Sequence, residues 1–279
     1  MDLSIIILTY NNKNLLEECI RSIKANTKVI SYELIVVDNN STDGTQDHVR
    51  RIFPDIKLID NEKNLGFTRA NNKGLKIAKG RYSLILNDDT YLRTDAFSDV
   101  VKYMDSDTSI AICGPKLLNT DGTVQHQGSV FTARTWRSKE PVFVDMVIGA
   151  CMFIRAAALE RIGIFDENLF FYNDDIDLCR RARSSGYKVA YYPLAGIYHV
   201  GGMTMKKSFN KLLFTEGYRG GLYFCKKHYG LIAYQAYRLV LYFLVLLVLP
   251  FSIFNRKKLE AYSDILKMIM TGEIVRDMI

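Results

Sequence analysis

Residues 3–12 read LSIIILTYNN, an apolar run rich in β-branched side chains that ends in polar residues. A run of this length, bounded by turn-forming residues, is typical of a buried β-strand. The pattern returns at 32–40, YELIVVDNN, and at 81–90, RYSLILNDDT, while residues 13–26 have the apolar spacing of a helix. Strands that alternate with helices predict an α/β fold with a mostly parallel central sheet flanked by helices.

Polar clusters follow the predicted strands where each strand ends. They are TYNN at 9–12, DNNST at 38–42 and NDDT at 87–90. In a parallel sheet covered on both faces, ligands bind beyond the carboxyl ends of the strands, near a switch in strand order. We therefore expect the three clusters to converge on one crevice.

The bulk composition is that of a globular protein. The chain has 279 residues, of which 48% are hydrophobic and 24% are charged, and this balance excludes disorder along the whole chain. Its 5 cysteines form no CxxC pair, which favours reduced thiols in a cytosolic compartment over a disulfide framework or a zinc site. The N-terminus has no basic region before its apolar run, so we interpret it as a first strand and not as a signal peptide.

The last part of the chain differs in charge and hydropathy. The net charge of +7 lies entirely in residues 201–279, which hold 12 Lys and Arg against 5 Asp and Glu. Residues 239–254 carry no charge. A helix of that length is ~24 Å long, shorter than the ~30 Å hydrocarbon core of a bilayer. We expect a helix that lies in the membrane interface, while a buried core helix or a dimer interface stays open as the alternative.

Two acidic clusters and one histidine carry candidate chemistry. Asp88 and Asp89 follow a strand, a second cluster spans 174–177, and His199 follows another predicted strand in GIYHVGG. Carboxylates with an imidazole are ligands for a divalent cation that keeps sites open for phosphate oxygens. The alternatives are an acidic turn for the first cluster and helix N-terminal charge for the second, whose helix Gly186 would close.

Several motifs together resemble a known family. The chain resembles the family 2 glycosyltransferases of GT-A fold over roughly residues 2–205, and within them the bacterial rhamnosyltransferase-like members. The nucleotide-binding half is matched by SIIILTYNN, VVDNNSTDGT, NLGFTRANNKG and LILNDDT, and the acceptor half by GACMFIRAAALERIGIFDENLFFYNDDIDLCRRARSSGYKVAYYP and HVGG. The motifs occur in the expected order and spacing.

The resemblance implies a nucleotide-sugar site. Thr9, Tyr10 and Asn11 would line the pocket for base and ribose. Asp38 would accept a hydrogen bond from a pyrimidine N3–H, and Asn40 would support the same edge.

Four further residues would lie on the ribose, diphosphate or sugar side. Arg69 and Asn71 would reach the ribose or the diphosphate. Gly149 and Ala150 would leave room beneath the sugar, although ordinary close packing explains small residues equally well.

The resemblance also implies a metal site with Mn²⁺ or Mg²⁺. The family's Asp-X-Asp motif falls on residues 87–89, where Asn87 replaces the first acid. Asp89 would then be the metal ligand together with His199, and Asp88 and Asn87 would lie near the sugar or ribose. The missing carboxylate at Asn87 lowers the charge available to the metal.

A second motif of the family implies the catalytic base. Asp175 would take the proton of an acceptor hydroxyl that attacks the anomeric carbon, with inversion of configuration. Asp174 and Asp177 would support it, and the helix-terminal reading of Asp177 is equally open. Positive charge on the leaving group would come from the metal and from Arg181, or from Lys206 and Lys207.

The expected organisation is a GT-A domain at 1–205 and a basic, apolar helical tail at 206–279. Within the first, 1–95 would bind the nucleotide sugar, and 96–205 would form the acceptor and catalytic half. The loop 119–141, which holds the only Trp, is assigned to the acceptor side, with a plain surface loop as its alternative. The tail would associate with a membrane surface through 231–258.

The predicted activity is a metal-dependent inverting transfer of rhamnose from dTDP-rhamnose to a glycan or a polyprenyl-diphosphate-linked sugar. It would serve cell-surface polysaccharide synthesis at the cytoplasmic face of the membrane, and a homodimer is left open. UDP-hexose and UDP-GlcNAc are the alternative donors. A sugar nucleotidyltransferase would need a glycine-rich loop that TYNNKN lacks. A nucleic-acid-binding protein would need interleaved aromatic and basic residues, which this chain lacks.

Overall fold

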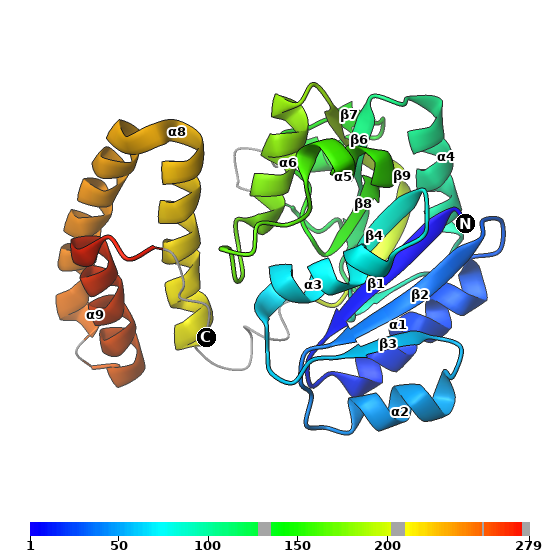
Figure 1. The fold of residues 1–279 in the computed structure, drawn as a ribbon, viewed down its shortest axis with the longest axis horizontal. Coiled ribbons are helices and arrows are strands. Elements are labelled where there is room, and N and C mark those ends of the chain that lie inside the picture. Colours follow the sequence, from blue (N-terminus) through cyan, green and yellow to red (C-terminus); the bar gives the residue numbers. More distant parts are fainter. Residues whose placement is uncertain (128–134, 202–209, 253, 275–279) are drawn as a thin grey trace. The chain divides into compact units, whose positions relative to one another are not determined.

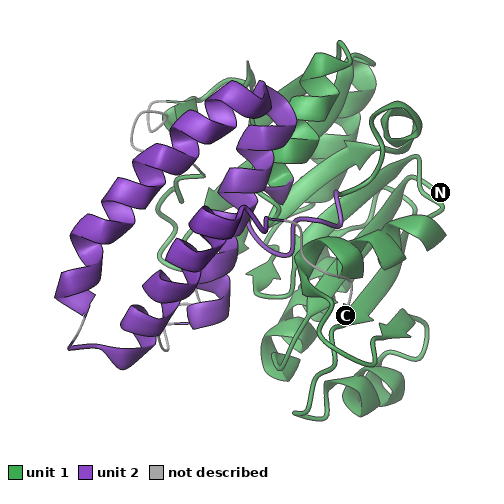
Figure 2. Cartoon of the chain, turned by 60° about the vertical axis from the view of Figure 1, so that its left-hand side comes forward, with its two compact units in different colours: residues 1–165, 175–201 green, residues 166–174, 202–279 purple. Residues whose placement is uncertain are grey.

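The computed structural model describes residues 1–127, 135–201, 210–252 and 254–274 (Figure 1). The chain forms two compact units (Figure 2). We call residues 1–165 with 175–201 the sheet unit, and residues 166–174 with 202–279 the tail unit. The sequence placed a single boundary near residue 205, whereas the tail unit also takes in 166–174.

The sheet unit is built on a nine-stranded sheet in the order β3-β2-β1-β4-β8-β6-β9-β5, with β7 paired to β9. The strands are β1 Leu3–Thr9, β2 Tyr32–Asp38, β3 Lys57–Asp60, β4 Tyr82–Asn87, β5 Thr90–Tyr91, β6 Ile110–Leu118, β7 Val142–Phe143, β8 Cys151–Arg155 and β9 Lys188–His199.

The sheet is mixed and mostly parallel, as expected, because its two longest strands, β6 and β9, also pair in parallel. Strands β3, β2, β1 and β4 are parallel neighbours. Beyond them β8 lies antiparallel to both β4 and β6, and the short β5 and β7 lie antiparallel to β9. The α/β architecture is confirmed, and its parallel half carries the three predicted strand ends.

Helices cover both faces of the sheet because successive side chains in a strand point to opposite sides. Ile5 and Ile7 pack in one core with α1, α2 and α4, while Ile6 packs in a second core with α3, α5 and α6. The helices of this unit are α1 Lys13–Asn26, α2 Thr45–Ile52, α3 Gly66–Ile77, α4 Ala96–Ser106, α5 Ala156–Ile162 and α6 Asp174–Ser184, whose first residue belongs to the tail unit.

The tail unit is helical. Helix α8, Lys211–Val248, is interrupted at Gly230, whose φ of 80° and ψ of −178° suit glycine. The two halves of α8 fold back on each other and α9, Arg256–Thr271, packs beside them (Figure 1). Their shared core contains Leu222, Tyr234 and Ile265.

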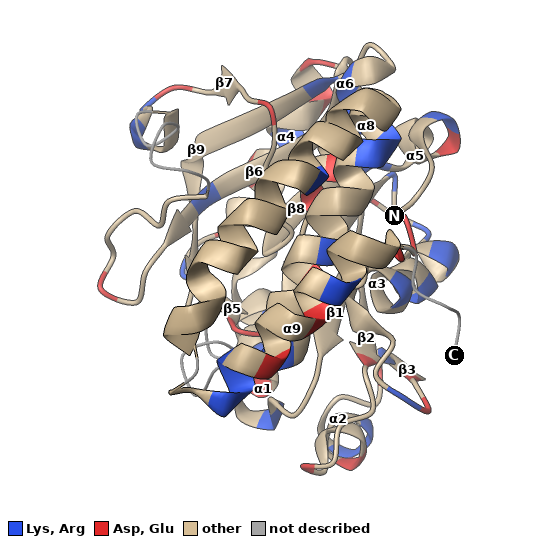
Figure 3. Ribbon diagram, turned by 90° about the vertical axis from the view of Figure 1, so that its left-hand side faces the viewer, with Lys and Arg blue, Asp and Glu red and all other residues tan. Residues whose placement is uncertain are grey.

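The second half of α8 leaves large apolar side chains uncovered within this unit. Ile232 is 89% exposed and Phe243 is 61% exposed. Among the described residues, one helix, 211–252, is long and apolar enough to cross a membrane, judged by length and composition alone. Charged residues are sparse along this part of α8 and frequent on α9 (Figure 3).

Candidate active site

The ends of β1, β2 and β4 lie side by side at one edge of the sheet. Thr9 pairs in register with Asp38, and Leu8 pairs with Asn87. The backbone continues the alignment past the strand ends, because Asn39 N–H donates to the Thr9 carbonyl at 2.9 Å. The three polar clusters therefore form one continuous edge.

Asp88 is fixed at this edge by two hydrogen bonds. Thr9 Oγ1 donates to Asp88 Oδ2 at 2.7 Å, and Asn12 Nδ2 donates to Oδ1 at 3.0 Å. Burial raises the pKa of Asp88 to about 7 despite these bonds, and the neighbouring Asp89 charge acts in the same direction. Asn12 was missed in the sequence, although it belongs to the first polar cluster.

Asp89 faces His199 across the pairing of β5 with β9. Thr90 is in register with His199, which brings Asp89 Oδ1 to 3.2 Å from His199 Nε2. The other carboxylate oxygen, Oδ2, accepts from Gly201 N–H at 3.1 Å. Both side chains are buried.

Gln125 orients the imidazole. Its Oε1 lies 2.6 Å from His199 Nδ1, and its Nε2 donates to Asn119 Oδ1 at 3.3 Å. Because Oε1 can only accept, Nδ1 carries a proton, and a neutral imidazole held in this way keeps the lone pair of Nε2 on the side of Asp89. Asn87 Nδ2 lies 3.3 Å from the same Nε2. Gln125 lies in the loop 119–141, where the sequence offered no signal for a single residue.

This arrangement fits a divalent cation. Asp89 Oδ1 is buried, makes no hydrogen bond among the described residues, and faces the Nε2 lone pair. Two acceptors that face each other in this way are satisfied by a shared cation, and a hydrogen bond to the far ring nitrogen is usual for metal-ligating histidine. Within the described ranges no group of three or more His, Cys, Asp or Glu residues could hold a metal. Further ligands would have to come from outside these side chains.

Asp38 is buried with one carboxylate oxygen unused. Its Oδ1 accepts from Ser41 N–H and from Gln46 Nε2, both at 2.8 Å. Its Oδ2 has no hydrogen-bond partner in the described part of the chain. A buried carboxylate oxygen without a donor is costly, and a ligand N–H would satisfy it.

The loops after β1 and β2 hold the other residues predicted for the base and ribose. Asn11 Oδ1 accepts from Thr42 N–H at 2.7 Å, which ties the two loops together. Asn11 and Asn40 have φ values of 52° and 70°, a left-handed conformation that Asn tolerates. Tyr10 is 50% exposed beside them.

Arg69 and Asn71 lie on α3, and their predicted place on the ribose or diphosphate side stays a prediction. They are two positions apart on α3, and residues with that spacing point to different sides of a helix. Asn71 is fully buried, its Nδ2 donates to the Phe67 carbonyl at 3.0 Å, and its Oδ1 has no partner among the described residues. Arg69 is partly exposed.

Gly149 and Ala150 support the packing alternative. A Cβ on Gly149 would lie 2.8 Å from Cζ of Phe67, so the aromatic ring occupies the space that the missing side chain leaves. Ala150 is buried, and its carbonyl accepts from Asn87 N–H at 3.0 Å. Both residues thus position β4 and α3 next to the polar edge.

Asp175 lies in the first turn of α6. Its Oδ1 accepts from Ile176 N–H at 2.8 Å. Burial raises the pKa of Asp175 above its ordinary value, although backbone hydrogen bonds from Ile176 and Gly149 lower it. A raised pKa is expected of a carboxylate that accepts a proton near neutral pH.

Asp177 and Arg181 form a buried pair with a structural role. Arg181 Nε donates to Asp177 Oδ2 at 2.8 Å, four residues back on α6. The rest of the guanidinium binds the carbonyls of Ile162, Gly163 and Ile164 at the end of α5. These bonds correct the expectation that Arg181 supplies charge to a leaving group, and they favour the structural reading of Asp177. Asp174 is buried at the first position of α6. Lys206 and Lys207 lie outside the described residues.

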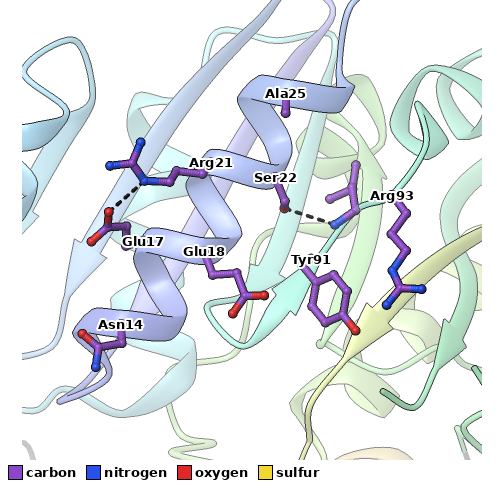
Figure 4. Close-up of a pocket in the computed structure, with 9 residues that line it drawn as sticks. Asn14, Glu17, Glu18, Arg21, Ser22, Ala25, Tyr91 and Arg93 are labelled. Atoms are coloured by element: carbon purple, nitrogen blue, oxygen red, sulfur yellow. Dashed lines mark hydrogen bonds and ion pairs between the residues drawn. The ribbon is translucent and has the colours of Figure 1, made fainter. Parts of the chain in front are cut away.

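A shallow groove of about 700 Å³ lies next to this edge, between α1 and residues 91–93 (Figure 4). Glu18 and Arg21 line it on the helix side, and Tyr91 and Arg93 on the other. None of the predicted nucleotide-binding residues lines it.

The α/β sheet, with its polar edge and its carboxylate–imidazole pair, agrees with the GT-A fold of glycosyltransferases that the sequence predicts. Residues 4–163 match the model of the family described as Glycosyl transferase family 2. The chain belongs to this family and is a glycosyltransferase. The match ends before Asp175 and His199, so it does not cover their roles.

Relatives with curated names agree with the family. The chain is 27% identical over 213 residues to the "Low-salt glycan biosynthesis hexosyltransferase Agl10" of Haloferax volcanii, covering 71% of this chain and 67% of that protein. It is 23% identical over 234 residues to the "N-acetylglucosaminyl-diphospho-decaprenol L-rhamnosyltransferase" of Mycobacterium tuberculosis, covering 71% and 75%. The chain spans only 24% and 16% of two longer relatives, from Sinorhizobium fredii and Myxococcus xanthus.

A solved structure shares the fold. A mannosyltransferase from Pyrobaculum calidifontis, solved with GDP-Man and Mn²⁺, superposes with a TM-score of 0.62 at 18% identity. The superposition covers 98% of this chain and 86% of that one.

Proposed function

We propose that this chain is a metal-dependent, inverting glycosyltransferase that uses a pyrimidine-nucleotide sugar, with dTDP-rhamnose as the first candidate donor. The observation that carries the proposal is the buried pair of Asp89 Oδ1 and His199 Nε2, 3.2 Å apart, at the edge where three strands end. UDP-hexoses and UDP-GlcNAc are the alternative donors.

Asp38 is the residue proposed to select the base. Its Oδ2, which has no hydrogen-bond partner among the described residues, is an acceptor, and a pyrimidine N3–H is a donor of matching chemistry. Asn11 and Asn40 shape the loops around this position, and Tyr10 offers an exposed ring. The thymine and uracil rings share the N3–H group, so this contact does not separate dTDP from UDP donors.

Asp89 and His199 are proposed to hold a divalent metal, Mn²⁺ or Mg²⁺. When bound, such a metal stabilises the negative charge that develops on the leaving diphosphate. Gln125 holds the imidazole in the tautomer that leaves Nε2 free. Asp88, fixed by Thr9 and Asn12, is next to Asp89 in the chain and is proposed to lie near the sugar or ribose.

Asp175 is the proposed base of a single displacement. The acceptor oxygen attacks the anomeric carbon while its proton passes to the Asp175 carboxylate. The bond from the anomeric carbon to the diphosphate oxygen breaks, and the nucleoside diphosphate leaves with the electron pair. Attack from the face opposite the leaving group inverts the anomeric configuration.

The tail is proposed to bind the cytoplasmic face of a membrane through 231–258, where a polyprenyl-diphosphate-linked sugar is presented. Its support is the uncovered apolar face of α8, followed directly by Arg256, Lys257 and Lys258. The helix α9 that packs on α8 carries exposed charges, including Asp264. A hairpin standing across the bilayer would carry them into hydrocarbon, so we place it in the plane of the interface.

The name of the Mycobacterium tuberculosis relative supports a rhamnosyl donor and a polyprenyl-linked acceptor. The Myxococcus xanthus relative, named "O-antigen biosynthesis protein RfbC", supports a role in cell-surface polysaccharide synthesis. Membership of a glycosyltransferase family weighs against a sugar nucleotidyltransferase or a binding protein without activity. A homodimer stays a prediction.

A donor screen tests the proposal. Thermal unfolding is followed with dTDP-rhamnose, UDP-glucose, UDP-GlcNAc and GDP-mannose, each with Mn²⁺, with Mg²⁺ or with EDTA. A donor that binds the native state raises the unfolding temperature by mass action. We expect a pyrimidine donor to stabilise the protein, and only with metal. Stabilisation by GDP-mannose alone would reject the role of Asp38, and stabilisation equal in EDTA would reject the metal site.

A further inference from the structure

The segment that leads into the proposed base belongs to the tail unit. The chain leaves the sheet unit after Phe165 and returns to it at Asp175. The nine residues between them, 166–174, cluster with α8. Asp175 is thus joined by one peptide bond to a segment that clusters with the tail unit.

Asp166 anchors the start of this segment. Its Oδ2 accepts from Lys227 Nζ at 2.6 Å and from the Tyr223 hydroxyl at 2.8 Å. Asn168 Nδ2 donates to the same hydroxyl at 3.0 Å. Burial alone would raise the pKa of Asp166, but the bonds from Lys227, Asn168 and Tyr223 outweigh it and lower the pKa to about 2. The carboxylate is therefore charged and held throughout the neutral range.

The end of the segment, at Tyr172 and Asn173, lies close to Gly220 on α8. A Cβ at this position would lie 2.9 Å from Asn173 Nδ2, 3.3 Å from the Tyr172 carbonyl oxygen and 3.4 Å from Leu169 Cδ2. Tyr172 and Asn173 have φ values of 68° and 63°. A left-handed conformation at two successive residues other than glycine persists only where the surroundings hold it. The close approach of Tyr172 and Asn173 to Gly220 on α8 supports this conformation.

We propose that the first half of α8 is a positioning element for catalysis, which sets the backbone of 166–174 and through it the place of the Asp175 carboxylate. The proposal rests on the assignment of Asp175 as base. Asp166, Gly220 and Tyr223 are then positioning residues that contact no substrate. A displacement of a reacting group by about 1 Å costs on the order of 100-fold in rate, so loss of these contacts should lower turnover more than donor binding.

Two neighbouring glycines provide a matched test. Gly220→Ala places a methyl group against Asn173 and Tyr172, whereas Gly221→Ala places the same group 3.2 Å from the flexible end of Tyr237 in the same helix. Hydrogen–deuterium exchange of the full-length protein is measured for peptides covering 166–177. We expect faster exchange in Gly220→Ala and wild-type exchange in Gly221→Ala. Equal exchange in the two variants would overturn the proposed anchoring.

Turnover separates positioning from simple packing. Release of nucleoside diphosphate is followed with whichever sugar of the donor panel stabilises the protein most. We expect Gly220→Ala and Tyr223→Phe to lower kcat by about 10- to 100-fold while the KM for donor changes less than about twofold. Gly221→Ala should keep wild-type values. Faster exchange at 166–177 with kcat equal to that of Gly221→Ala would overturn the proposal.

Asp175→Asn distinguishes this proposal from the function on which it rests. If Asp175→Asn keeps its turnover, the base assignment fails, and with it any catalytic consequence of the anchoring. If Asp175→Asn is inactive but Gly220→Ala and Tyr223→Phe have wild-type kcat, the base assignment stands and the positioning role of α8 is rejected.

Discussion

The two units of this glycosyltransferase differ in which side chains they bury and which they expose. In the sheet unit, Asp38, Asp89 and His199 are buried at the edge where the strands end, and apolar side chains fill the cores on both faces. In the tail unit, large apolar side chains such as Ile232 and Phe243 are exposed along α8.

The difference indicates two kinds of ligand. Buried acceptors with unused lone pairs, such as Asp38 Oδ2 and Asp89 Oδ1, are satisfied by a small polar ligand and a cation. A contiguous exposed apolar face is satisfied by a partner phase or surface. The proposed function thus gives the chemistry to the sheet unit and the location of the enzyme to the tail unit. Each proposal can be tested by a substitution in its own unit.

The largest expected effect is that of Asp175→Asn. Removing a general base costs about 10²- to 10⁴-fold in turnover, because the acceptor hydroxyl loses its proton acceptor. Donor affinity should stay near that of the wild type in the thermal shift assay. Turnover within tenfold of the wild type would move the base elsewhere.

Substitution of His199 by Ala should weaken Mn²⁺-dependent donor binding, because the cation loses one of its two proposed protein ligands. Gln125→Ala should weaken the same binding by about 10-fold, which is less than the effect of His199→Ala. Substitutions that disturb the orientation of a metal ligand typically cost 10- to 100-fold in metal affinity or activity. Titration of donor at fixed Mn²⁺ measures both. His48→Ala is the matched control, because His48 pairs with Glu17 at 2.6 Å elsewhere in the sheet unit. Equal affinities for the His199 and His48 variants would contradict the metal site.

Two phenylalanines of similar exposure, one in each unit, test whether the tail unit binds a membrane. Phe243 on α8 is 61% exposed and Phe143 on β7 is 57% exposed. Phe243→Ser should reduce binding to anionic phospholipid vesicles by about tenfold, since full burial of such a side chain is worth about 1.5–3 kcal/mol. Phe143→Ser should leave vesicle flotation unchanged. The membrane assignment is wrong if the two variants float alike.

The smallest effect is one of stability and pH. Burial raises the pKa of Asp175 in the folded state above its unfolded value, so ionised Asp175 destabilises the fold as pH rises through that range. Asp175→Asn should therefore unfold at a higher temperature than the wild type at pH 7. The difference should shrink as pH falls and disappear only at about pH 3 and below, under the ordinary pKa of an Asp carboxyl, where Asp175 is protonated in both states. A larger gain at low pH than at pH 7 would contradict the raised pKa.

Much of the parallel half-sheet could be predicted from local pattern. The runs at 3–9, 32–38 and 82–87 are apolar, β-branched and followed by polar turns, so their type and their common edge follow from short-range rules. The antiparallel direction of β8 could not, because it depends on a pairing with β4 that spans some seventy residues. The direction in which a strand pairs does not change the apolar pattern of its own residues.

The residues of the candidate site divide in the same way, into those that local motifs predict and those that they do not. Asp38, Asp89 and Asp175 stand in motifs. Gln125 stands in none, and Asn12, although it ends the first polar cluster, binds Asp88, a partner 76 positions away that no spacing reveals. Arg181 was misjudged because the carbonyls it binds, at the end of α5, become its neighbours only in the folded chain. Motifs therefore predict residues that are proposed to contact a ligand, but they predict poorly the residues that position other side chains.

The pairing of the two-residue strand β5 with β9 has a consequence for folding. Asp89 and His199 are 110 positions apart, and β9 is the last strand of the sheet to leave the ribosome. A chain that has folded only its four parallel strands β1 to β4 has the edge proposed for a base and ribose but no imidazole beside Asp89. Contacts of such long range form late and slowly. Acquisition of metal affinity would therefore report the completion of the sheet, and a metal-sensitive probe could time the last step of folding in this enzyme.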